Sequence, residues 1–323
     1  MYSRPLREVP VVRRIEYLLD YLLAVDRRCT MGEIEEILSE RKRQFEMEKI
    51  LAVGRGNPFR RDLVKTSRLA KECFRLAKAL RYVEKFGNGI AISDKGRHFL
   101  DVSNEERRIL LAEAYSEVYP HLATLALTLS KLDSEEAVLP MMNKPKFRPE
   151  AEKIGLNIGQ VTFDIIRDIA TSLGILNWYH EGDGVQRRQH VYLTCSLATE
   201  VPRRRSIRLY WDDDWLYVVE RLMDRASIRD TLWKAYLALA DGIPGSPIFY
   251  SAVREKVCAN LRIRDDQFDA EVLQMVDWDD VFQVVWSEGV LPYQRDSAGM
   301  LKSLPPKTES GNYIVYLKIV RRG

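Results

Sequence analysis

The segment spanning residues 62–100 constrains the fold of this chain most strongly, because it joins a helical pattern to a tight turn. Over residues 62–84, apolar side chains recur at the spacing that places them on one side of a helix. The following stretch "FGNGI" carries Gly87, Asn88 and Gly89, and these residue types adopt the positive φ angles of a tight hairpin turn. The sequence therefore predicts a helix that buries one side and leads into a β-hairpin.

The two sides of this predicted helix differ in charge. The apolar side consists of Leu69, Cys73, Leu76, Ala77 and Leu80. The other side carries five cations at intervals of three or four residues, with Glu72 as the one acid among them: Lys65, Arg68, Lys71, Arg75 and Lys78. Most charged helix faces are only solvated surface. A nearly uninterrupted basic row beside a hairpin nevertheless favours contact with a phosphate-lined groove.

Charge is unevenly distributed along the chain. The formal net charge is only +3, which alone does not indicate a nucleic-acid-binding protein. Residues 55–100, however, hold twelve basic and four acidic residues, a net charge of +8, so the rest of the chain carries −5. The positive charge is therefore concentrated where the basic helix and the hairpin are predicted.

Composition excludes several classes of protein. Hydrophobic residues make up 46% and charged residues 30% of the chain, a balance typical of a folded, soluble protein. No apolar run approaches the length of a membrane span, and the first residues lack the apolar core of a secretory signal. The four cysteines lie far apart in unrelated contexts, which favours a reducing cytosol. We therefore expect a cytoplasmic protein of two or three domains.

Two further helices are predicted before the basic one. Residues 11–25 repeat apolar side chains at helical spacing. Thr30 stands at an N-cap position with Glu33 three residues later, which is the pattern of a capping box. Residues 30–38 should therefore form a second helix, which either ends there or continues toward the turn residues of "GRGNPF".

The order helix, helix, basic helix, hairpin resembles the winged-helix family over about residues 10–100. The similarity is carried by "ALRYVEK" and "IAISDKGRHFL", with Ser93 in the place of the usual threonine of a Thr-x-x-Gly ending. The resemblance implies that the third helix enters the DNA major groove and that the hairpin, or wing, contacts the backbone or the minor groove. It would place Lys65, Arg68 and Lys71 near base edges, and Arg75 and Lys78 near phosphates.

A second unit with a similar plan is expected over residues 103–200. Residues 104–132 are helical with a break near Pro120, and two shorter helices follow at 148–156 and 158–173. The runs "LNWYHE" and "QHVYLTC" then alternate like paired strands around "GDGVQRR". The predicted DNA contacts of this unit are Gln160, Arg167, Arg187 and Arg188. Asp164 and Asp168 lie on the same helix and would repel phosphates.

The remaining residues, 201–323, are predicted to form an acidic helical domain, which is either a third winged helix or a different fold. Helices are expected at 208–226, 227–240, 248–261 and 265–288, followed by a C-terminal strand. The helix at 265–288 carries seven acids: Asp265, Asp266, Asp269, Glu271, Asp277, Asp279 and Asp280. Because these acids would repel DNA, this third of the chain is expected to dock a partner protein.

No catalytic centre stands out in the sequence. The run "YWDDDW" could supply carboxylates for Mg²⁺, but three successive residues of a helix do not point at one ion. A phosphate-loop pattern, a Rossmann glycine triad and zinc-spaced cysteine pairs are all absent from the sequence, and the four histidines are dispersed. We therefore expect no enzyme activity, no cofactor and no metal site.

The sequence thus predicts a mainly α-helical protein with small β-hairpin wings, built from the units 1–102, 103–200 and 201–323. We expect a noncatalytic protein that binds double-stranded DNA. The runs "ALRYVEKFGNGIAISDKGRHFL" and "EERRILLAEAYSEVYPHLATLALTLSKL" loosely resemble the DNA-recognition lobe of type IIS restriction enzymes, which implies a restriction, antiviral-defence or regulatory assembly. The alternative is a protein–protein adaptor that joins subunits without touching DNA, and a basic helix face does not by itself distinguish DNA from RNA.

Overall fold

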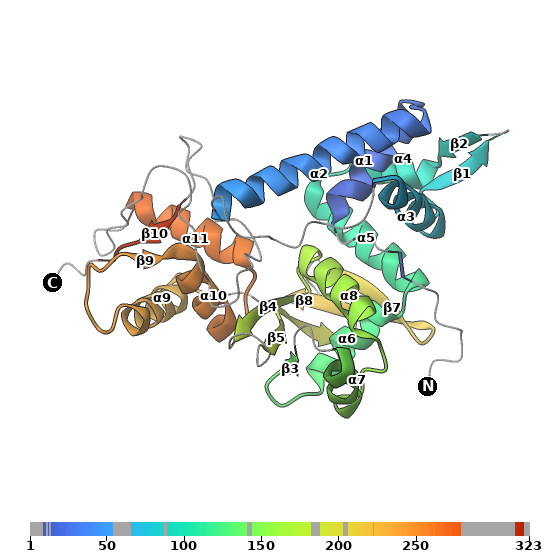
Figure 1. Cartoon of the computed structure of the whole chain (residues 1–323). Helices are drawn as coiled ribbons and strands as arrows, with labels where there is room; N and C mark the ends of the chain where they lie inside the picture. The colour runs from blue at the N-terminus through green and yellow to red at the C-terminus, as the bar shows by residue number, and fades with distance from the viewer. Residues whose placement is uncertain are drawn as a thin grey trace.

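The computed structural model describes residues 9–10, 12, 14–53, 66–86, 89–140, 144–181, 188–202, 206–221, 223–278 and 314–319. Within these residues the chain is mainly helical, with eleven helices and four small antiparallel sheets. Figure 1 shows α2 as a long helix that crosses the top of the molecule. In the same described part, no helix is both long and apolar enough to cross a membrane.

Three helices and a hairpin form the N-terminal part. Their bounds are α1 Ile15–Asp26, α2 Met31–Val53, α3 Thr66–Ala79, β1 Val83–Phe86 and β2 Gly89–Ile92. The three helices pack against one another, and β1 pairs with β2 around the predicted turn. The capping box is confirmed, because the Thr30 main-chain N donates to Glu33 Oε2 at 2.6 Å and the Glu33 N donates to Thr30 Oγ1 at 3.4 Å. The second helix continues well beyond residue 38.

A short helix, α4 Asp94–Asp101, follows β2 directly. Ser93 caps it, since Ser93 Oγ accepts a hydrogen bond from the Gly96 N at 3.0 Å and donates to the Arg81 carbonyl at 2.7 Å. Gly96 lies against the carbonyl oxygen of Tyr82, and a Cβ atom on Gly96 would overlap that oxygen. Ser93 and Gly96 therefore fix the end of the hairpin against the end of α3.

The middle of the chain forms two helix pairs and a sheet. The elements are α5 Asn104–Val118, α6 His121–Ser130, β3 Glu136–Pro140, α7 Lys144–Lys153, α8 Gln160–Ser172, β4 Leu176–Glu181 and β5 Arg188–Leu193. The predicted break at Pro120 and the predicted pairing of β4 with β5 are both confirmed. Strand β3, which lies between the helices predicted at 104–132 and 148–156, pairs with β5 and gives the order β3-β5-β4.

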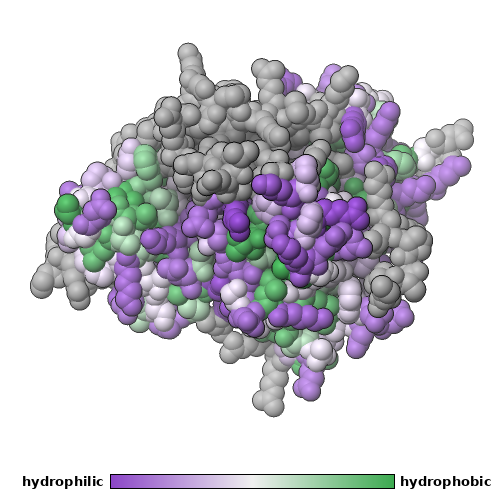
Figure 2. All heavy atoms as spheres, turned by 60° about the horizontal axis from the view of Figure 1, so that its bottom comes forward, coloured by the Kyte–Doolittle hydropathy of each residue, from purple (hydrophilic) through white to green (hydrophobic). Residues whose placement is uncertain are grey.

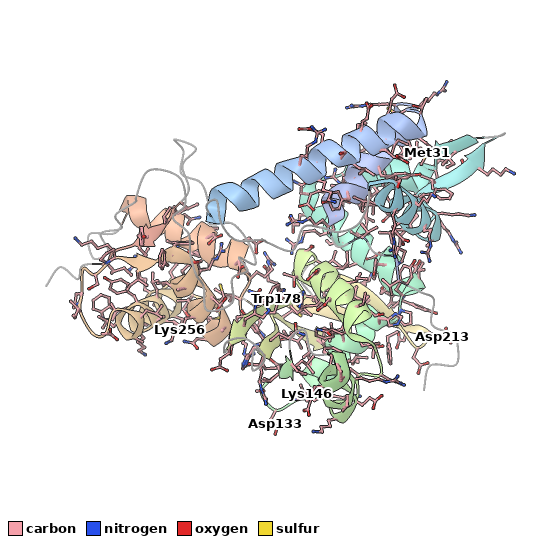
Figure 3. The ribbon with its side chains drawn as sticks, viewed as in Figure 1. Met31, Asp133, Lys146, Trp178, Asp213 and Lys256 are labelled. Atoms are coloured by element: carbon pink, nitrogen blue, oxygen red, sulfur yellow. The ribbon has the colours of Figure 1, made fainter. Side chains whose placement is uncertain are left out.

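A second three-stranded sheet replaces a predicted helix. Its strands are β6 Cys195–Ala198, β7 Ile207–Trp211 and β8 Asp214–Glu220, in the order β6-β8-β7. The helix expected over 208–226 is therefore wrong. Asp212 and Asp213 adopt positive φ angles of 50° and 65° and form the two-residue turn of the hairpin, while Leu209, Leu216 and Val218 alternate into the core. Figure 3 shows Asp213 at the right of the molecule.

The C-terminal part has its own core. It contains α9 Arg225–Leu239, β9 Ile248–Phe249, α10 Tyr250–Leu261, α11 Asp265–Trp278 and β10 Tyr316–Leu317, and β9 pairs with β10. One hydrophobic cluster runs from Val9 to Val218, and a second runs from Ile228 to Ile319. The two cores therefore separate between Val218 and Ile228, beyond the boundary predicted at residue 200.

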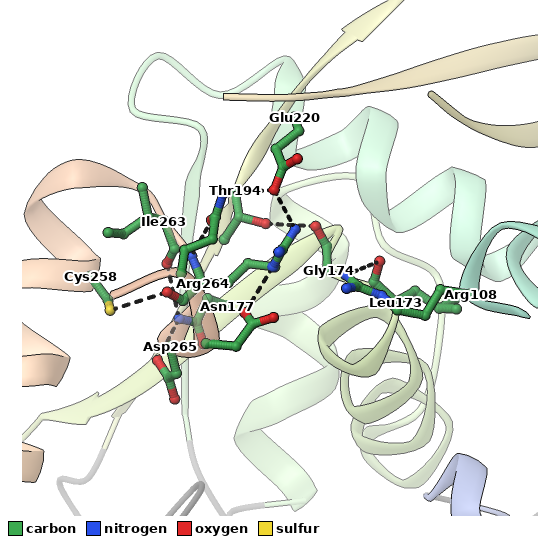
Figure 4. Close-up of polar contacts among 12 residues, drawn as sticks. Arg108, Leu173, Gly174, Asn177, Thr194, Glu220, Cys258, Ile263, Arg264 and Asp265 are labelled. Carbon is green, nitrogen blue, oxygen red and sulfur yellow. Dashed lines mark hydrogen bonds and ion pairs between the residues drawn. The ribbon is translucent and has the colours of Figure 1, made fainter. Parts of the chain in front are cut away.

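Polar contacts join the two cores (Figure 4). Asn177 on β4 donates from Nδ2 to the carbonyl of Ile263 at 3.1 Å and to Asp265 Oδ1 at 2.9 Å. Arg264 Nη1 forms an ion pair with Glu220 Oε1 at 2.7 Å. Because such contacts depend on the exact placement of polar groups, this junction sets how the C-terminal part docks.

Candidate nucleic-acid interface

Helix α3 buries its apolar side as the sequence predicts. Leu69, Cys73, Leu76, Ala77 and Leu80 are each no more than 2% exposed, and α3 packs against α1, α2 and β1. The other side faces solvent, since Arg68, Lys71, Arg75 and Lys78 are all exposed. Lys65 lies outside the described residues, so the fifth predicted cation has no structural account. Four cations thus share one exposed flank of α3, and their role in binding stays a prediction.

The cations of this flank differ in how they are held. Arg75 Nη1 donates to Glu72 Oε1 at 3.0 Å and to Glu72 Oε2 at 3.1 Å. Lys78 Nζ lies 5.9 Å from the centre of the Phe74 ring. Within the part of the chain that the structure describes, Arg68 and Lys71 have no ion-pair partner. Most of the flank is therefore positive charge that no carboxylate of the described residues neutralises.

Further exposed cations surround α3, and the predicted contact residues did not include them. They are Arg81 at the end of the helix, Lys85 on β1, and Lys95 and Arg97 on α4. Over residues 66–100 the chain has eight cations and three acids, so the surface around α3 is positive. The charge excess over residues 55–100 was the sequence signal that could have identified them.

Arg167 is not a surface residue, and the prediction that it reaches a duplex is wrong. Only 7% of Arg167 is exposed. Its guanidinium contacts Asp168 Oδ1 at 2.6 Å, Asp164 Oδ1 at 3.2 Å and Gln189 Oε1 at 2.6 Å, and it lies over the ring of Trp178, which Figure 3 shows near the centre of the molecule. The two acids that were expected to repel phosphates instead neutralise Arg167.

Two of the other predicted contacts of the second unit, Gln160 and Arg188, are described, and they lie on elements other than α3. Gln160 is the first residue of α8 and is partly buried, while Arg188 is exposed at the start of β5, opposite Pro140 and Glu181. Arg187 lies outside the described residues. Figure 1 shows α3 at the upper right, with β4 and β5 lower and further left. Among the described residues, Arg188 on β5 therefore does not lie beside the α3 cations.

A histidine with two carboxylate partners lies toward the turn end of the β4–β5 hairpin. His190 Nδ1 lies 2.6 Å from Glu136 Oε1, and His190 Nε2 lies 2.8 Å from Glu181 Oε2. Tyr179 stacks on the imidazole with ring centres 4.4 Å apart. Burial lowers the pKa of His190, but the hydrogen bonds and charges of Glu136 and Glu181 outweigh burial and leave that pKa raised above 6.5. His190 therefore joins three strands, and its carboxylate partners favour the protonated form of its ring.

Two acids of helix α11 contact other residues of this chain instead of facing a partner protein. Asp269 accepts hydrogen bonds from Arg254 Nη1 at 2.9 Å and from the Tyr250 hydroxyl at 2.7 Å. Asp265 contacts Asn177 at the junction. The predicted partner surface is therefore wrong for Asp265 and Asp269. The side chain of Asp277 and the whole of residues 279–280 lie outside the described part.

A cavity of about 280 Å³ lies at the junction of the two cores. Arg108 and Arg264 line it, and burial together with the charge of Arg264 lowers the pKa of Arg108. Gly174, which has a φ angle of +74°, also lines the cavity, and a Cβ on it would overlap the Arg108 guanidinium. Glu105 and Glu220 complete the charged lining. Because two acids balance the two arginines, the cavity does not indicate an anion site.

Figure 2 shows hydrophobic side chains interspersed with hydrophilic ones on the face turned toward the viewer, a mixture typical of an ordinary solvent-facing surface. Among the described residues, no group of three or more His, Cys, Asp or Glu side chains is placed to hold a metal ion. The exposed cationic flank of α3 and its surroundings therefore form the strongest candidate interface.

Comparisons with known proteins leave the chain without an assigned family. No protein-family model matches it, and no curated protein matches it. Among solved structures, the restriction endonuclease FokI aligns with a TM-score of 0.33 and 13% sequence identity. That alignment covers 93% of this chain and 66% of the FokI chain. Similarity at this level carries no functional conclusion, so the candidate interface rests on the geometry of this chain alone.

Proposed function

We propose that this chain is a noncatalytic protein that binds double-stranded DNA through the exposed flank of α3. The observation that carries the proposal is the four-cation row of Arg68, Lys71, Arg75 and Lys78 on one exposed side of a helix whose other side is buried. The packing of α1, α2 and α3 and the hairpin that follows support a winged-helix arrangement. In that arrangement α3 enters the major groove and the β1–β2 hairpin lies beside it.

Physical reasons favour a duplex as the ligand. The major groove of DNA is wide enough to admit an α-helix, and unpaired cations gain free energy by displacing the counterions of phosphates. The nearby cations Arg81, Lys85, Lys95 and Arg97 extend the positive surface beyond α3. A surface of this kind suits the recognition or scaffolding subunit of a restriction, defence or regulatory assembly, in which another chain supplies the chemistry.

The test is a binding titration with fluorescently labelled duplex DNA, single-stranded DNA and RNA. The double variant Lys71→Glu, Lys78→Glu should lose most duplex affinity, because it reverses two charges that pair with no carboxylate among the described residues. The matched control is Lys234→Glu, Lys256→Glu, which reverses two exposed lysines of the C-terminal part. Figure 3 shows Lys256 at the lower left, far from α3. The control should bind as the wild type does.

Salt dependence gives a second readout. If four cations contact phosphates, the logarithm of the binding constant should fall against the logarithm of salt concentration with a slope of about −3.6. A chain that binds no duplex at low salt would refute the proposal and favour the protein–protein adaptor. If the chain binds single-stranded DNA or RNA more tightly than duplex DNA, that polymer would replace double-stranded DNA as the ligand proposed for this surface. Cleavage of the duplex in the presence of Mg²⁺ would refute the noncatalytic assignment.

A further inference from the structure

A buried carboxylate lies beside the cationic flank of α3. The side chain of Glu72 is 9% exposed, whereas that of Arg75 is 44% exposed. Both Glu72 oxygens accept hydrogen bonds from the same nitrogen, Arg75 Nη1. The spacing of three residues places the two side chains on neighbouring positions of the helix surface. An acid therefore reaches from the buried side of the helix to one member of an otherwise basic row.

Burial of the Glu72 carboxylate costs free energy that its hydrogen bonds with Arg75 help to recover. Removing a carboxylate from water costs free energy, and the cost is recovered only when the charge is paired and hydrogen-bonded. An acid near a phosphate-binding surface also weakens attraction for the phosphates. A neutral or apolar residue would fill the same position without either penalty. The Glu72–Arg75 pair also restricts the orientation of the Arg75 guanidinium.

The pair distinguishes Arg75 from the other cations of the flank. A lysine ammonium is a flexible point charge, which suits a phosphate in any direction. A guanidinium is a planar fork, and a contact at one nitrogen sets the direction of the whole fork. Arg68 and Lys71 have no carboxylate partner in the described part of the chain. The rigid member of the row is therefore Arg75.

We propose that Arg75 is the residue of α3 that reads a guanine in the major groove, and that Glu72 is its positioning residue. This inference rests on the proposed duplex-binding function. An arginine fork is the commonest side chain for guanine because it donates to O6 and N7 together, and such readout needs a side chain that supporting contacts hold in place. The assignment moves Arg75 from the phosphate role that the winged-helix resemblance implied to a base-reading role.

The experiment is selection of binding sites from duplexes with a randomised core, followed by affinity measurements on the selected site and on single-base changes of it. Wild-type protein should select a site with one dominant guanine. The variants Arg75→Lys and Glu72→Gln should each reduce the preference for that guanine by about tenfold, within the range for one bidentate contact. The salt slope should stay at the wild-type value, because both variants keep the cation at position 75.

Two matched controls accompany these variants. Arg68→Lys makes the same exchange at an arginine of the same flank that pairs with no carboxylate of the described residues, and Glu84→Gln removes an exposed acid of β1. Both controls should keep the guanine preference. Thermal melting of each variant reports whether Glu72→Gln affects folding, and Arg75→Lys tests the inference independently of that variant.

The outcomes separate the inference from the proposed function. If Arg75→Lys and Glu72→Gln weaken binding to all duplexes equally and leave the guanine preference intact, Arg75 contacts phosphate and the inference is wrong, although duplex binding stands. If the wild type selects sites without any base preference, the inference is likewise wrong, and duplex binding still stands. If the wild type binds no duplex at all, the proposed function fails and the inference fails with it.

Discussion

The guanidinium of Arg167 on α8 lies 4.2 Å from the centre of the Trp178 ring on β4. The cation is held over an aromatic face and is paired with two aspartates of its own helix. Arg167, which was predicted from the sequence to contact DNA, thus connects helix α8 to strand β4 inside the protein. Its removal should affect folding rather than binding.

We expect Arg167→Met to destabilise the protein by about 3 kcal/mol, because it leaves Asp164 and Asp168 without their buried partner. Urea denaturation followed by circular dichroism measures the change in the free energy of unfolding. The matched control is Arg188→Met on β5, whose exposed side chain should change that free energy by less than about 0.5 kcal/mol. Equal effects of the two changes would contradict the internal role of Arg167.

The contacts of His190 predict that stability depends on pH. Both imidazole nitrogens face carboxylates, Glu136 and Glu181, and only the protonated ring can donate to both. Glu136 is also paired with Arg262, and Tyr179 stacks on the ring. Because the folded-state pKa of His190 is raised above 6.5, its stabilising contribution is complete below about pH 6.5 and is lost as pH rises through the raised value.

The measurement is the free energy of unfolding from pH 5.5 to pH 9. The wild type should lose part of its stability as the pH rises above about 6.5, and His190→Gln should lose less. His98→Gln, which changes an exposed histidine of α4, is the control and should keep the wild-type pH dependence. A pH profile that His190→Gln leaves unchanged would show that this histidine is not the titrating group.

The hydrogen bonds of Asn177 help to attach the C-terminal part to strand β4. Its Nδ2 donates to the Ile263 carbonyl and to Asp265, so Asn177→Ala leaves two polar groups at the junction without this donor. We expect a loss of about 1 to 3 kcal/mol, expressed mainly as weaker docking of α10 and α11. Amide hydrogen exchange should show faster exchange at the junction, whereas Asn157→Ala at an exposed position should not. Uniformly faster exchange throughout the chain would point to global destabilisation instead.

Gly96 gives a test of the hairpin geometry. A Cβ at this position would overlap the Tyr82 carbonyl, so Gly96→Ala should destabilise the protein by about 1 to 3 kcal/mol. The same change at Gly32 in α2 meets no atom closer than 4.0 Å, and it should be neutral or stabilise by up to about 1 kcal/mol. Differential scanning calorimetry compares the two. Gly96→Ala should lower the melting temperature, Gly32→Ala should leave it unchanged or raise it, and a stabilising Gly96→Ala would contradict the close approach.

The basic flank of α3 is a feature that the local spacing of residues in the sequence determines. A helix has a fixed repeat, so the spacing of Leu69, Cys73 and Leu76 was sufficient to predict which side of α3 is buried and which cations are exposed. The glycines after β1 and the Thr30–Glu33 capping box are likewise local signals, and each marks an element where the structure has one. These features depend on residues only a few positions apart, which is why the sequence reveals them.

Tertiary structure alone decided which polar residues are internal. The contact of Arg167 with Gln189 spans 22 positions of the chain, and that of Asn177 with Asp265 spans 88. The β7–β8 hairpin was mistaken for a helix because its alternation is short and its turn is made of aspartates rather than glycine. Helical and strand spacing predict which side of an element is buried, but they do not specify the residue that packs there. Partners distant in sequence made Arg167 a structural cation and left α3 as the exposed basic surface.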